Sequence, residues 1–316
     1  MQSPLRGIVP PMITPMASHD ALDVAGCERL VEHIVTGGVH GLFILGTTGE
    51  GPSLDLQTAS QLIELTVKQV NGRVPVLVGI THNCLNNSIQ LAQASADAGA
   101  DAVVASSPHY FQIGQPELLD YLHQLVTEVP LPLVLYNMPG LTNVNFEPDT
   151  VKQMLDYDNI IGIKDSSGDI QCAVDYLEIA KQRPDWTVMT GPEEILAQAL
   201  NLGIMGGVCG GANLFPQLFA DLYEAHQTGD TAKVQTCHED LLQVGKHLYG
   251  IGQFGSSYIK GIKTALSCLG ICDDQMALPL RGFGDEQRNI IRQRLEQLGQ
   301  LQSPGIQAVL AQNSTA

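Results

Sequence analysis

Residues 132–164, PLVLYNMPGLTNVNFEPDTVKQMLDYDNIIGIK, hold two short apolar runs that reveal how the chain is built. The first is Pro132–Tyr136 (PLVLY) and the second is Ile160–Lys164 (IIGIK). Each run is almost continuously apolar until its last residue, which is typical of a strand buried on both faces of a parallel sheet. The runs lie about 30 residues apart, the length of one βα unit. This stretch therefore predicts a strand, a helical connection and a parallel strand.

The same kind of run recurs along most of the chain. Six further runs are Gly7–Pro10, Gly41–Leu45, Pro75–Ile80, Ala102–Ala105, Thr187–Thr190 and Gly206–Cys209. Eight β runs with helices between them predict an α/β fold, a (β/α)8 TIM barrel, rather than an open sheet. No G-x-G-x-x-G motif follows the first run, which disfavours a dinucleotide-binding fold.

Helical patterns between the runs have recognisable ends. One helix is expected from an N-cap at Asp23 to Gly37-Gly38, and another from near Ser53 to Asn71-Gly72. A third runs from Asn87 to Gly99, where a glycine can adopt the left-handed conformation that ends a helix.

Beyond about Pro216 the strand signals stop and helical stripes dominate. We therefore predict three parts of the chain. Residues 1–225 form the barrel, residues 226–300 form a C-terminal helical extension, and residues 301–316 form a mobile tail.

The composition excludes several classes of protein. Among 316 residues, 16 are Lys or Arg and 33 are Asp or Glu, which gives a net charge of −17. Nucleic acids and anionic membranes bind cationic patches, so neither is an expected partner. The 44% of hydrophobic residues exclude a disordered chain. No uncharged apolar run approaches the roughly 20 residues of a membrane span.

Three features of the sequence indicate where the protein is located and whether it holds a cofactor. They are the N-terminal residues, the cysteines and the histidines. The first residues lack the apolar segment of a signal peptide, and seven scattered cysteines are typical of reduced thiols, so we expect a cytoplasmic protein. The nine histidines show neither HxxH nor HExxH spacing, and Cys268 and Cys272 have no second pair beside them. No metal site and no cofactor are therefore expected.

Four polar segments directly follow predicted strands, at the barrel end where active sites of this fold lie. They are Gly46–Gly51 (GTTGEG), Tyr136–Pro139 (YNMP), Lys164–Gly168 (KDSSG) and Thr190–Glu194 (TGPEE).

Lys164 is the candidate nucleophile among these residues. It closes an apolar strand, and apolar surroundings favour the uncharged amine that forms a Schiff base. The other seven lysines lie in polar helical or loop contexts. The alternative is a lysine that runs along the strand end to solvent and has no chemical role.

The remaining segments offer a proton carrier and polar contacts. Tyr136 could move protons beside Lys164, or it could be a core aromatic residue. The Thr47-Thr48 pair could hold a carboxylate, or form an ordinary βα turn. The Glu193-Glu194 pair could accept hydrogen bonds from substrate hydroxyls, or complement a helix dipole.

Taken together and in this order, GTTGEG, YNMP, GIKDSSG and GPEE resemble the dihydrodipicolinate synthase / N-acetylneuraminate lyase family of pyruvate-dependent class I aldolases. The resemblance covers about residues 5–298. It implies a (β/α)8 barrel with a helical C-terminal extension, assembled as a homotetramer that is a dimer of dimers. It also implies pyruvate and a small aldehyde or 2-oxo acid as partners.

The resemblance implies roles for the site residues. Lys164 would form the Schiff base with C2 of a 2-oxo acid, and Tyr136 would be the general acid and base. Thr47 would link Tyr136 to Tyr110, which family members lend to the site of a neighbouring subunit. The residues implied to contact substrate are Thr47, Thr48, Leu141, Ser166, Gly191, Glu193, Glu194 and Val208, with Gly191 and Val208 lining the site through their backbone carbonyls.

Two departures from family patterns bear on the substrate. Leu141 stands where dihydrodipicolinate synthases carry an arginine, and an apolar side chain cannot replace a bidentate charge clamp. The Glu193-Glu194 pair matches the acidic pair of sialate lyases, but Gly210 replaces a serine that those lyases use. The best reading is an aldolase for a smaller hydroxylated 2-oxo acid, such as 2-keto-3-deoxygluconate or 4-hydroxy-2-oxoglutarate.

Several alternatives remain open. They are 4-hydroxy-tetrahydrodipicolinate synthase, N-acetylneuraminate lyase, a Schiff-base dehydratase of sugar acids and a binding protein for 2-oxo acids that has lost catalysis.

Overall fold

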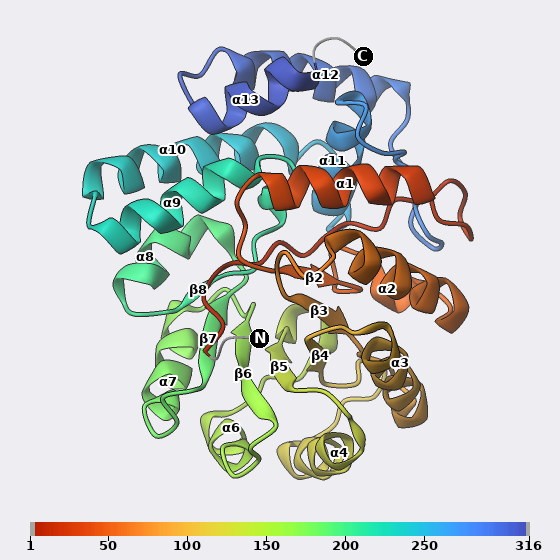
Figure 1. Ribbon diagram of the computed structural model, residues 1–316, viewed down its shortest axis with the longest axis vertical. Coiled ribbons are helices and arrows are strands. Elements are labelled where there is room, and N and C mark those ends of the chain that lie inside the picture. The colour runs from red at the N-terminus through yellow and green to blue at the C-terminus, as the bar shows by residue number, and fades with distance from the viewer. Residues whose placement is uncertain (1–3, 314–316) are drawn as a thin grey trace.

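The predicted runs form eight parallel strands in the computed structural model, which describes residues 4–313 (Figure 1). The strands are β1 (Gly7–Ile8), β2 (Leu42–Ile44), β3 (Val76–Gly79), β4 (Ala102–Ser106), β5 (Leu133–Asn137), β6 (Ile160–Asp165), β7 (Thr187–Thr190) and β8 (Gly206–Gly207). Their hydrogen-bonded order is β1-β8-β7-β6-β5-β4-β3-β2.

The residues after β1 close this sheet into a barrel. The Phe43 backbone N–H donates to the Pro10 carbonyl at 3.0 Å, and the Met12 N–H donates to the Phe43 carbonyl at 2.8 Å. These bonds join the chain beyond β1 to β2 as parallel neighbours. The predicted (β/α)8 barrel is therefore confirmed.

Helices surround the strands in Figure 1. Those of the barrel part are α1 (Val24–Thr36), α2 (Leu56–Val70), α3 (Leu85–Ala98), α4 (Gln115–Glu128), α5 (Pro139–Thr142), α6 (Pro148–Met154), α7 (Ile170–Ala180), α8 (Leu196–Asn201) and α9 (Pro216–Thr228). Those that follow are α10 (Thr231–Leu248), α11 (Ser257–Cys268), α12 (Asp285–Gly299) and α13 (Pro304–Asn313).

The predicted helix ends agree with the structure at both ends of α1 and at the end of α2, where Asn71 is the C-cap, but the start of α2 differs. Asp23 caps α1, where its side chain accepts from the Gly26 N–H at 2.8 Å. Ser53 does not begin α2, because residues Gly51–Ser53 form a separate 3-10 turn. Asp55 caps α2 instead, since its carboxylate accepts from the Thr58 N–H at 2.7 Å.

The C-terminal helices α12 and α13 lie together at one end of the molecule in Figure 1. The tail expected at 301–316 is wrong over its described part, because α13 occupies Pro304–Asn313. Ile306 is fully buried and Val309 nearly so, which ties the segment to the fold. A ten-residue helix gains its stability from such packing more than from its own sequence, so composition alone did not indicate it. Residues 314–316 lie outside the described part.

The domain boundary near residue 225 remains a prediction. The last barrel helix, α9, ends at Thr228 and leads after two residues into α10. Within residues 4–313, no helix has both the length and the apolar character needed to span a membrane.

The barrel interior is filled by a separate cluster of buried side chains. This inner cluster consists of Leu5, Val9, Phe43, Leu77, Ala102, Val104, Val134, Tyr136, Met189 and Val208. Tyr136 is thus the one member with a hydroxyl, and it closes the cluster at the strand ends. A rigid apolar floor lies beneath the polar segments that follow the strands.

Candidate active site

A cavity of about 720 Å³ opens at the carboxyl ends of the strands. The sequence-predicted residues that line it are Thr47, Thr48, Tyr136, Leu141, Lys164, Ser166, Gly191, Glu193, Glu194 and Val208. All predicted site residues except Tyr110 therefore meet in one place. Tyr136 and Lys164 lie at the carboxyl ends of β5 and β6, and the others lie in the segments after β2, β5, β6, β7 and β8, which explains why only the closed barrel assembles them.

Lys164 lies on the cavity floor against aromatic rings. It is opposite Tyr136 in the parallel register of β5 and β6, and its side chain is buried. The Lys164 Nζ atom is 4.1 Å from the centroid of the Tyr136 ring and 5.3 Å from that of Phe43. Among residues 4–313, Lys164 forms no ion pair with a carboxylate. The amine is thus held by ring faces and left without a countercharge.

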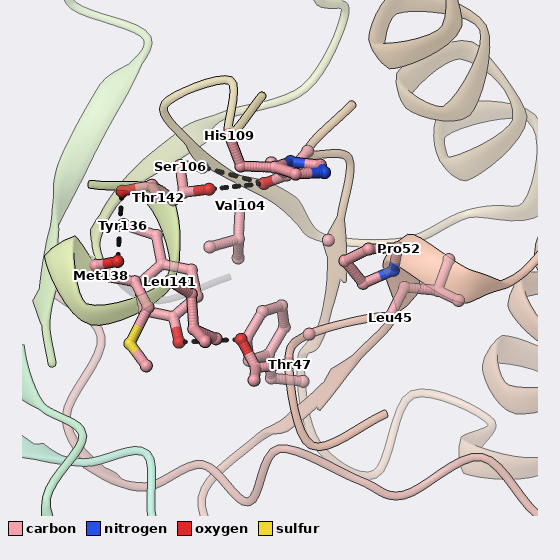
Figure 2. A pocket seen from close by; sticks show the side chains of 14 residues that line it. Leu45, Thr47, Pro52, Val104, Ser106, His109, Tyr136, Met138, Leu141 and Thr142 are labelled. Carbon is pink, nitrogen blue, oxygen red and sulfur yellow. Dashed lines mark hydrogen bonds between the residues drawn. The ribbon is translucent and has the colours of Figure 1, made fainter. Parts of the chain in front are cut away.

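Tyr136 and Thr47 point toward each other in Figure 2, where a dashed line joins their hydroxyls. The Tyr136 hydroxyl and Thr47 Oγ1 lie 3.3 Å apart. Both residues also line a second cavity of about 260 Å³, which extends toward Ser106 and His109. The Tyr136–Thr47 pair therefore stands between the two cavities and can carry a proton along one hydrogen bond.

Tyr110 is not brought to the site of its own chain. Its side chain is 78% exposed and lines neither cavity. It stacks edge-to-face on Phe111, with ring centroids 5.1 Å apart, and Phe111 is exposed as well. The role of Tyr110 in a neighbouring subunit stays a prediction.

Glu50 fixes the turn that carries Thr47 and Thr48, and no sequence pattern predicts this role. Glu50 adopts a left-handed backbone conformation with φ of 56°, which is strained for a residue with a side chain. One carboxylate oxygen accepts from Lys263 Nζ at 2.6 Å, and the other accepts from the Ala277 N–H at 2.8 Å. The Lys263 and Glu50 side chains are fully buried. The expectation that every lysine other than Lys164 lies in a polar context is therefore wrong for Lys263.

The predicted acidic pair divides into one buried and one exposed residue. The Glu193 carboxylate accepts from the Tyr249 hydroxyl at 2.6 Å and from the Gly211 N–H at 2.8 Å. Burial raises the pKa of Glu193 to about 7, although both hydrogen bonds act to lower it. Glu194 is exposed at the cavity rim. The two carboxyl groups thus differ in setting and in the chemistry open to them.

The ends of β5 and β6 are also joined by hydrogen bonds of side chains that do not line the cavity. Asn137 Nδ2 donates to Asp165 Oδ1 at 2.8 Å, and the Ser167 hydroxyl donates to Asp165 Oδ2 at the same distance. Burial raises the pKa of Asp165, which these hydrogen bonds oppose. Their positions in the sequence could have indicated this contact, because Asn137 directly follows Tyr136 and Asp165 directly follows Lys164.

Gly191 and Gly210 each lie so close to a neighbouring side chain that a Cβ atom would not fit. A Cβ atom on Gly191 would overlap the Ser166 hydroxyl, so residue 191 can offer only backbone to the cavity. A Cβ atom on Gly210 would overlap the hydroxyl oxygen of Tyr258. A serine side chain at position 210 would therefore collide with Tyr258 in this structure. Tyr258 lies 48 residues further along the chain, and no local pattern links the two.

No group of three or more His, Cys, Asp or Glu within residues 4–313 is arranged to hold a metal ion.

The chain is similar to known proteins over nearly its whole length. A family model described as the dihydrodipicolinate synthetase family matches residues 4–298. The 4-hydroxy-tetrahydrodipicolinate synthase of Pelobacter propionicus is 32% identical over 283 residues, which are 90% of this chain and 95% of that protein. YagE of Escherichia coli K12, named as a candidate 2-dehydro-3-deoxy-D-gluconate aldolase, is 32% identical over 295 residues, 92% of this chain and 96% of that one.

Solved structures share the fold. A dihydrodipicolinate synthase from Bacteroides thetaiotaomicron superposes with a TM-score of 0.91 at 45% identity, covering 94% of this chain and 100% of that one. The crystal structure of YagE in complex with pyruvate gives a TM-score of 0.88 at 30% identity, covering 95% and 100%. Sequence motifs, fold and relatives agree, and the chain therefore belongs to the dihydrodipicolinate synthetase family of aldolase-type lyases.

Proposed function

We propose that this chain is a class I aldolase that joins pyruvate to an aldehyde, or releases both, through a Schiff base on Lys164. The observation that carries the proposal is the setting of Lys164, whose amine lies on the cavity floor over the Tyr136 ring without an ion-pair partner among residues 4–313. The pyruvate complex of YagE, a protein of similar structure, supports a 2-oxo acid as the ligand.

The cleavage reaction can be followed atom by atom. The Lys164 amine adds to the C2 carbonyl of the substrate, and loss of water leaves an iminium ion. The C4 hydroxyl then loses its proton and the C3–C4 bond breaks, releasing an aldehyde while the bonding electrons move toward the iminium nitrogen. The resulting enamine takes a proton at C3, and water releases pyruvate and the free amine.

Tyr136 is the group proposed to move these protons. Its ring lies under the Lys164 amine and its hydroxyl lies 3.3 Å from Thr47 Oγ1, so proton acceptor and relay adjoin the reacting carbon atoms. Thr47 and Thr48 are proposed to hold the substrate carboxylate, with Ser166 and the backbone of Gly191 and Val208 completing the seat.

The charges around the cavity favour a hydroxylated substrate. Lys164 is its only basic lining residue among those described, and Glu193 and Glu194 are its acidic ones. Leu141 is 54% exposed at the rim and offers no charge to a second carboxylate. We therefore propose a 2-keto-3-deoxy sugar acid as substrate, which fits the aldolase name of YagE. The same argument disfavours 4-hydroxy-2-oxoglutarate, because its second carboxylate would meet no cation in the described cavity wall apart from Lys164.

Synthesis of 4-hydroxy-tetrahydrodipicolinate is the second candidate. The names of the Pelobacter and Bacteroides proteins favour it. That reaction would condense pyruvate with aspartate semialdehyde, whose carboxylate would need a cation that the described cavity wall lacks apart from Lys164.

The test traps the covalent intermediate and then compares substrates. Borohydride reduction in the presence of pyruvate is expected to attach one pyruvyl group, and peptide mass spectrometry is expected to locate it at Lys164. Pyruvate release from 2-keto-3-deoxygluconate should exceed, in kcat/KM, condensation of pyruvate with aspartate semialdehyde. Label at another lysine would overturn the mechanism. Preference for aspartate semialdehyde would replace the aldolase by the synthase, and loss of water without pyruvate would indicate a dehydratase.

Assembly is part of the same proposal. We propose a homotetramer in which exposed Tyr110 completes a neighbouring site. Sedimentation at the assay concentration should give an oligomer, and Tyr110→Phe should lower kcat more than it changes KM. A fully active monomer would contradict this.

A further inference from the structure

The C-terminal extension supplies part of the wall of the active-site cavity. Tyr249 at the end of α10, Ser256 and Gly255 in the connecting turn, and Tyr258 and Ile259 at the start of α11 all line it. The extension therefore does more than cover the outside of the barrel. Its two tyrosines bring phenol hydroxyls to the carboxyl ends of the strands.

The chain keeps space for these hydroxyls directly after β8. A Cβ atom on Gly210 would overlap the Tyr258 hydroxyl oxygen, and one on Gly211 would collide with the Tyr249 hydroxyl and with Glu193 Oε1. Neither glycine has a positive φ, so the backbone itself does not demand glycine there. The reason for two glycines in a row is room for the two tyrosines.

The two tyrosines are used differently. The Tyr249 hydroxyl donates to Glu193 at 2.6 Å, which commits its proton to that carboxylate. The Tyr258 hydroxyl lies over Gly210, and Tyr258 lines the same cavity as Thr48 of the turn after β2. Burial raises the pKa of Tyr258 well above its usual range. Tyr258 packs edge-to-face on Tyr249, with ring centroids 4.7 Å apart, so its orientation is fixed. A hydroxyl can donate one hydrogen bond and accept two, so the Tyr258 phenol in the cavity wall can bind a hydroxyl of a ligand.

We propose that Tyr258 is a substrate-binding residue that selects for hydroxyl groups on the aldehyde-derived part of the substrate. It lines the same cavity as Thr48, at the proposed carboxylate seat, and its ring packs on Tyr249, whose hydroxyl donates to Glu193. A substrate tail that extends from the Lys164 Schiff base toward Glu193 passes this phenol. The residue thus takes the place of a hydroxyl side chain at position 210. This inference rests on the proposed aldolase function.

The chemistry selects polyhydroxylated tails against apolar ones. The Tyr258 phenol in the cavity wall gains no hydrogen-bond partner from an apolar tail, whereas a tail hydroxyl provides one. The tail of a 2-keto-3-deoxy sugar acid offers such hydroxyls, and that of a plain 2-oxo acid does not.

The experiment compares two aldehydes that differ only in hydroxyl groups. Condensation of pyruvate with glyceraldehyde and with propanal is measured for the wild type, for Tyr258→Phe and for the matched control Tyr223→Phe, whose buried tyrosine lies on α9 outside the cavity. Borohydride trapping of pyruvate is measured on the same proteins. Tyr258→Phe keeps the ring and its packing, so it should fold.

The expected result is a fall of about tenfold or more in the glyceraldehyde to propanal ratio of kcat/KM for Tyr258→Phe. Pyruvate trapping at Lys164 should stay unchanged, and Tyr223→Phe should keep both values. An unchanged ratio would overturn the inference. Equal loss of pyruvate trapping would also overturn it, because Tyr258 would then serve the carboxylate seat.

A second variant moves the hydroxyl to another element. In Tyr258→Ala the space above position 210 is emptied, and adding Gly210→Ser should restore part of the lost glyceraldehyde preference. Failure of the serine to restore any preference would contradict the assignment of this place. If the wild type itself traps no pyruvate, the proposed aldolase function has failed, and that outcome is distinct from an unchanged ratio in an active enzyme.

Discussion

Lysine and glutamate side chains are buried together in two places, and their partners differ between the two. They form an ion pair with each other in one place and contact neutral groups in the other. Behind the Thr47–Thr48 turn, Lys263 and Glu50 meet at 2.6 Å and neutralise each other with no exposure to solvent. In the active-site cavity, Lys164 rests on the Tyr136 ring and Glu193 on the Tyr249 hydroxyl, both neutral groups. We call these the anchor pair, Glu50–Lys263, and the cavity charges, Lys164 and Glu193.

We infer that the paired side chains stabilise the fold, whereas the unpaired ones are available for chemistry. A buried ion pair recovers part of its desolvation cost from its partner, and removing one member leaves an uncompensated charge. A buried amine or carboxyl group without a countercharge remains free to react or to bind a ligand. We therefore expect substitutions in the anchor pair to lower the stability of the fold, and substitutions of the cavity charges to lower turnover.

Loss of the cavity lysine should give the largest change. Lys164→Met is expected to lower turnover by about 10⁴-fold or more, because Lys164 is the proposed Schiff-base residue and no other lysine is among the described residues that line the cavity. Thermal unfolding should be little affected, since an unpaired buried amine is replaced by an apolar side chain of similar length. The readouts are pyruvate release and differential scanning calorimetry. Residual activity within tenfold of the wild type would place the nucleophile elsewhere.

Loss of the anchor lysine should act on stability first. Lys263→Met leaves Glu50 buried and unpaired, at a cost of about 3–5 kcal/mol in the free energy of unfolding. For a chain of this size, that lowers Tm by roughly 10 °C. At 25 °C the folded fraction should still trap pyruvate at Lys164.

Two variants sharpen this second comparison. Lys260→Met removes a lysine from the same helix, one whose Nζ lies 5.9 Å from the Phe283 ring centroid, and should leave Tm nearly unchanged. Adding Glu50→Gln to Lys263→Met should recover part of the lost Tm, because no charge is then stranded. A double variant less stable than Lys263→Met would contradict the ion-pair explanation.

The relay beside the cavity lysine should give a smaller effect. Thr47→Val removes the hydroxyl that lies 3.3 Å from that of Tyr136 and keeps the side-chain shape. We expect kcat to fall about fivefold to tenfold, the value of one neutral hydrogen bond. Steady-state kinetics test this, with pyruvate trapping measured in parallel. An unaltered kcat would remove Thr47 from the relay.

The buried carboxyl group of Glu193 should make the stability of the folded protein depend on pH. Because burial raises the pKa of Glu193 to about 7, the folded protein resists ionisation that the unfolded chain undergoes near pH 4.5. The wild type should therefore lose stability as pH rises from about 4.5 to 7, and Glu193→Gln should not share this loss. The Tm of the variant minus that of the wild type should grow between pH 5 and pH 8. A difference that stays constant or shrinks would contradict the raised pKa.

Local sequence determined the barrel and most of the site. Lys164 and Tyr136 end apolar runs, and the carboxyl ends of parallel strands lie at the same end of the barrel. Thr47, Thr48 and Glu193 follow from the same argument, because each lies in the turn that comes after a strand. The period of a strand and the length of a βα unit are short-range properties that a linear pattern can carry.

Only the tertiary structure decided what surrounds those residues. Glu50 and Lys263 are 213 residues apart, and Tyr258 meets Gly210 across the join between barrel and extension. Helix α13 is held by burial of Ile306 and Val309, where composition suggested a mobile end. The physical reason is common to all three. Contacts between distant segments depend on how whole helices pack, and packing leaves no periodic signal in either segment alone.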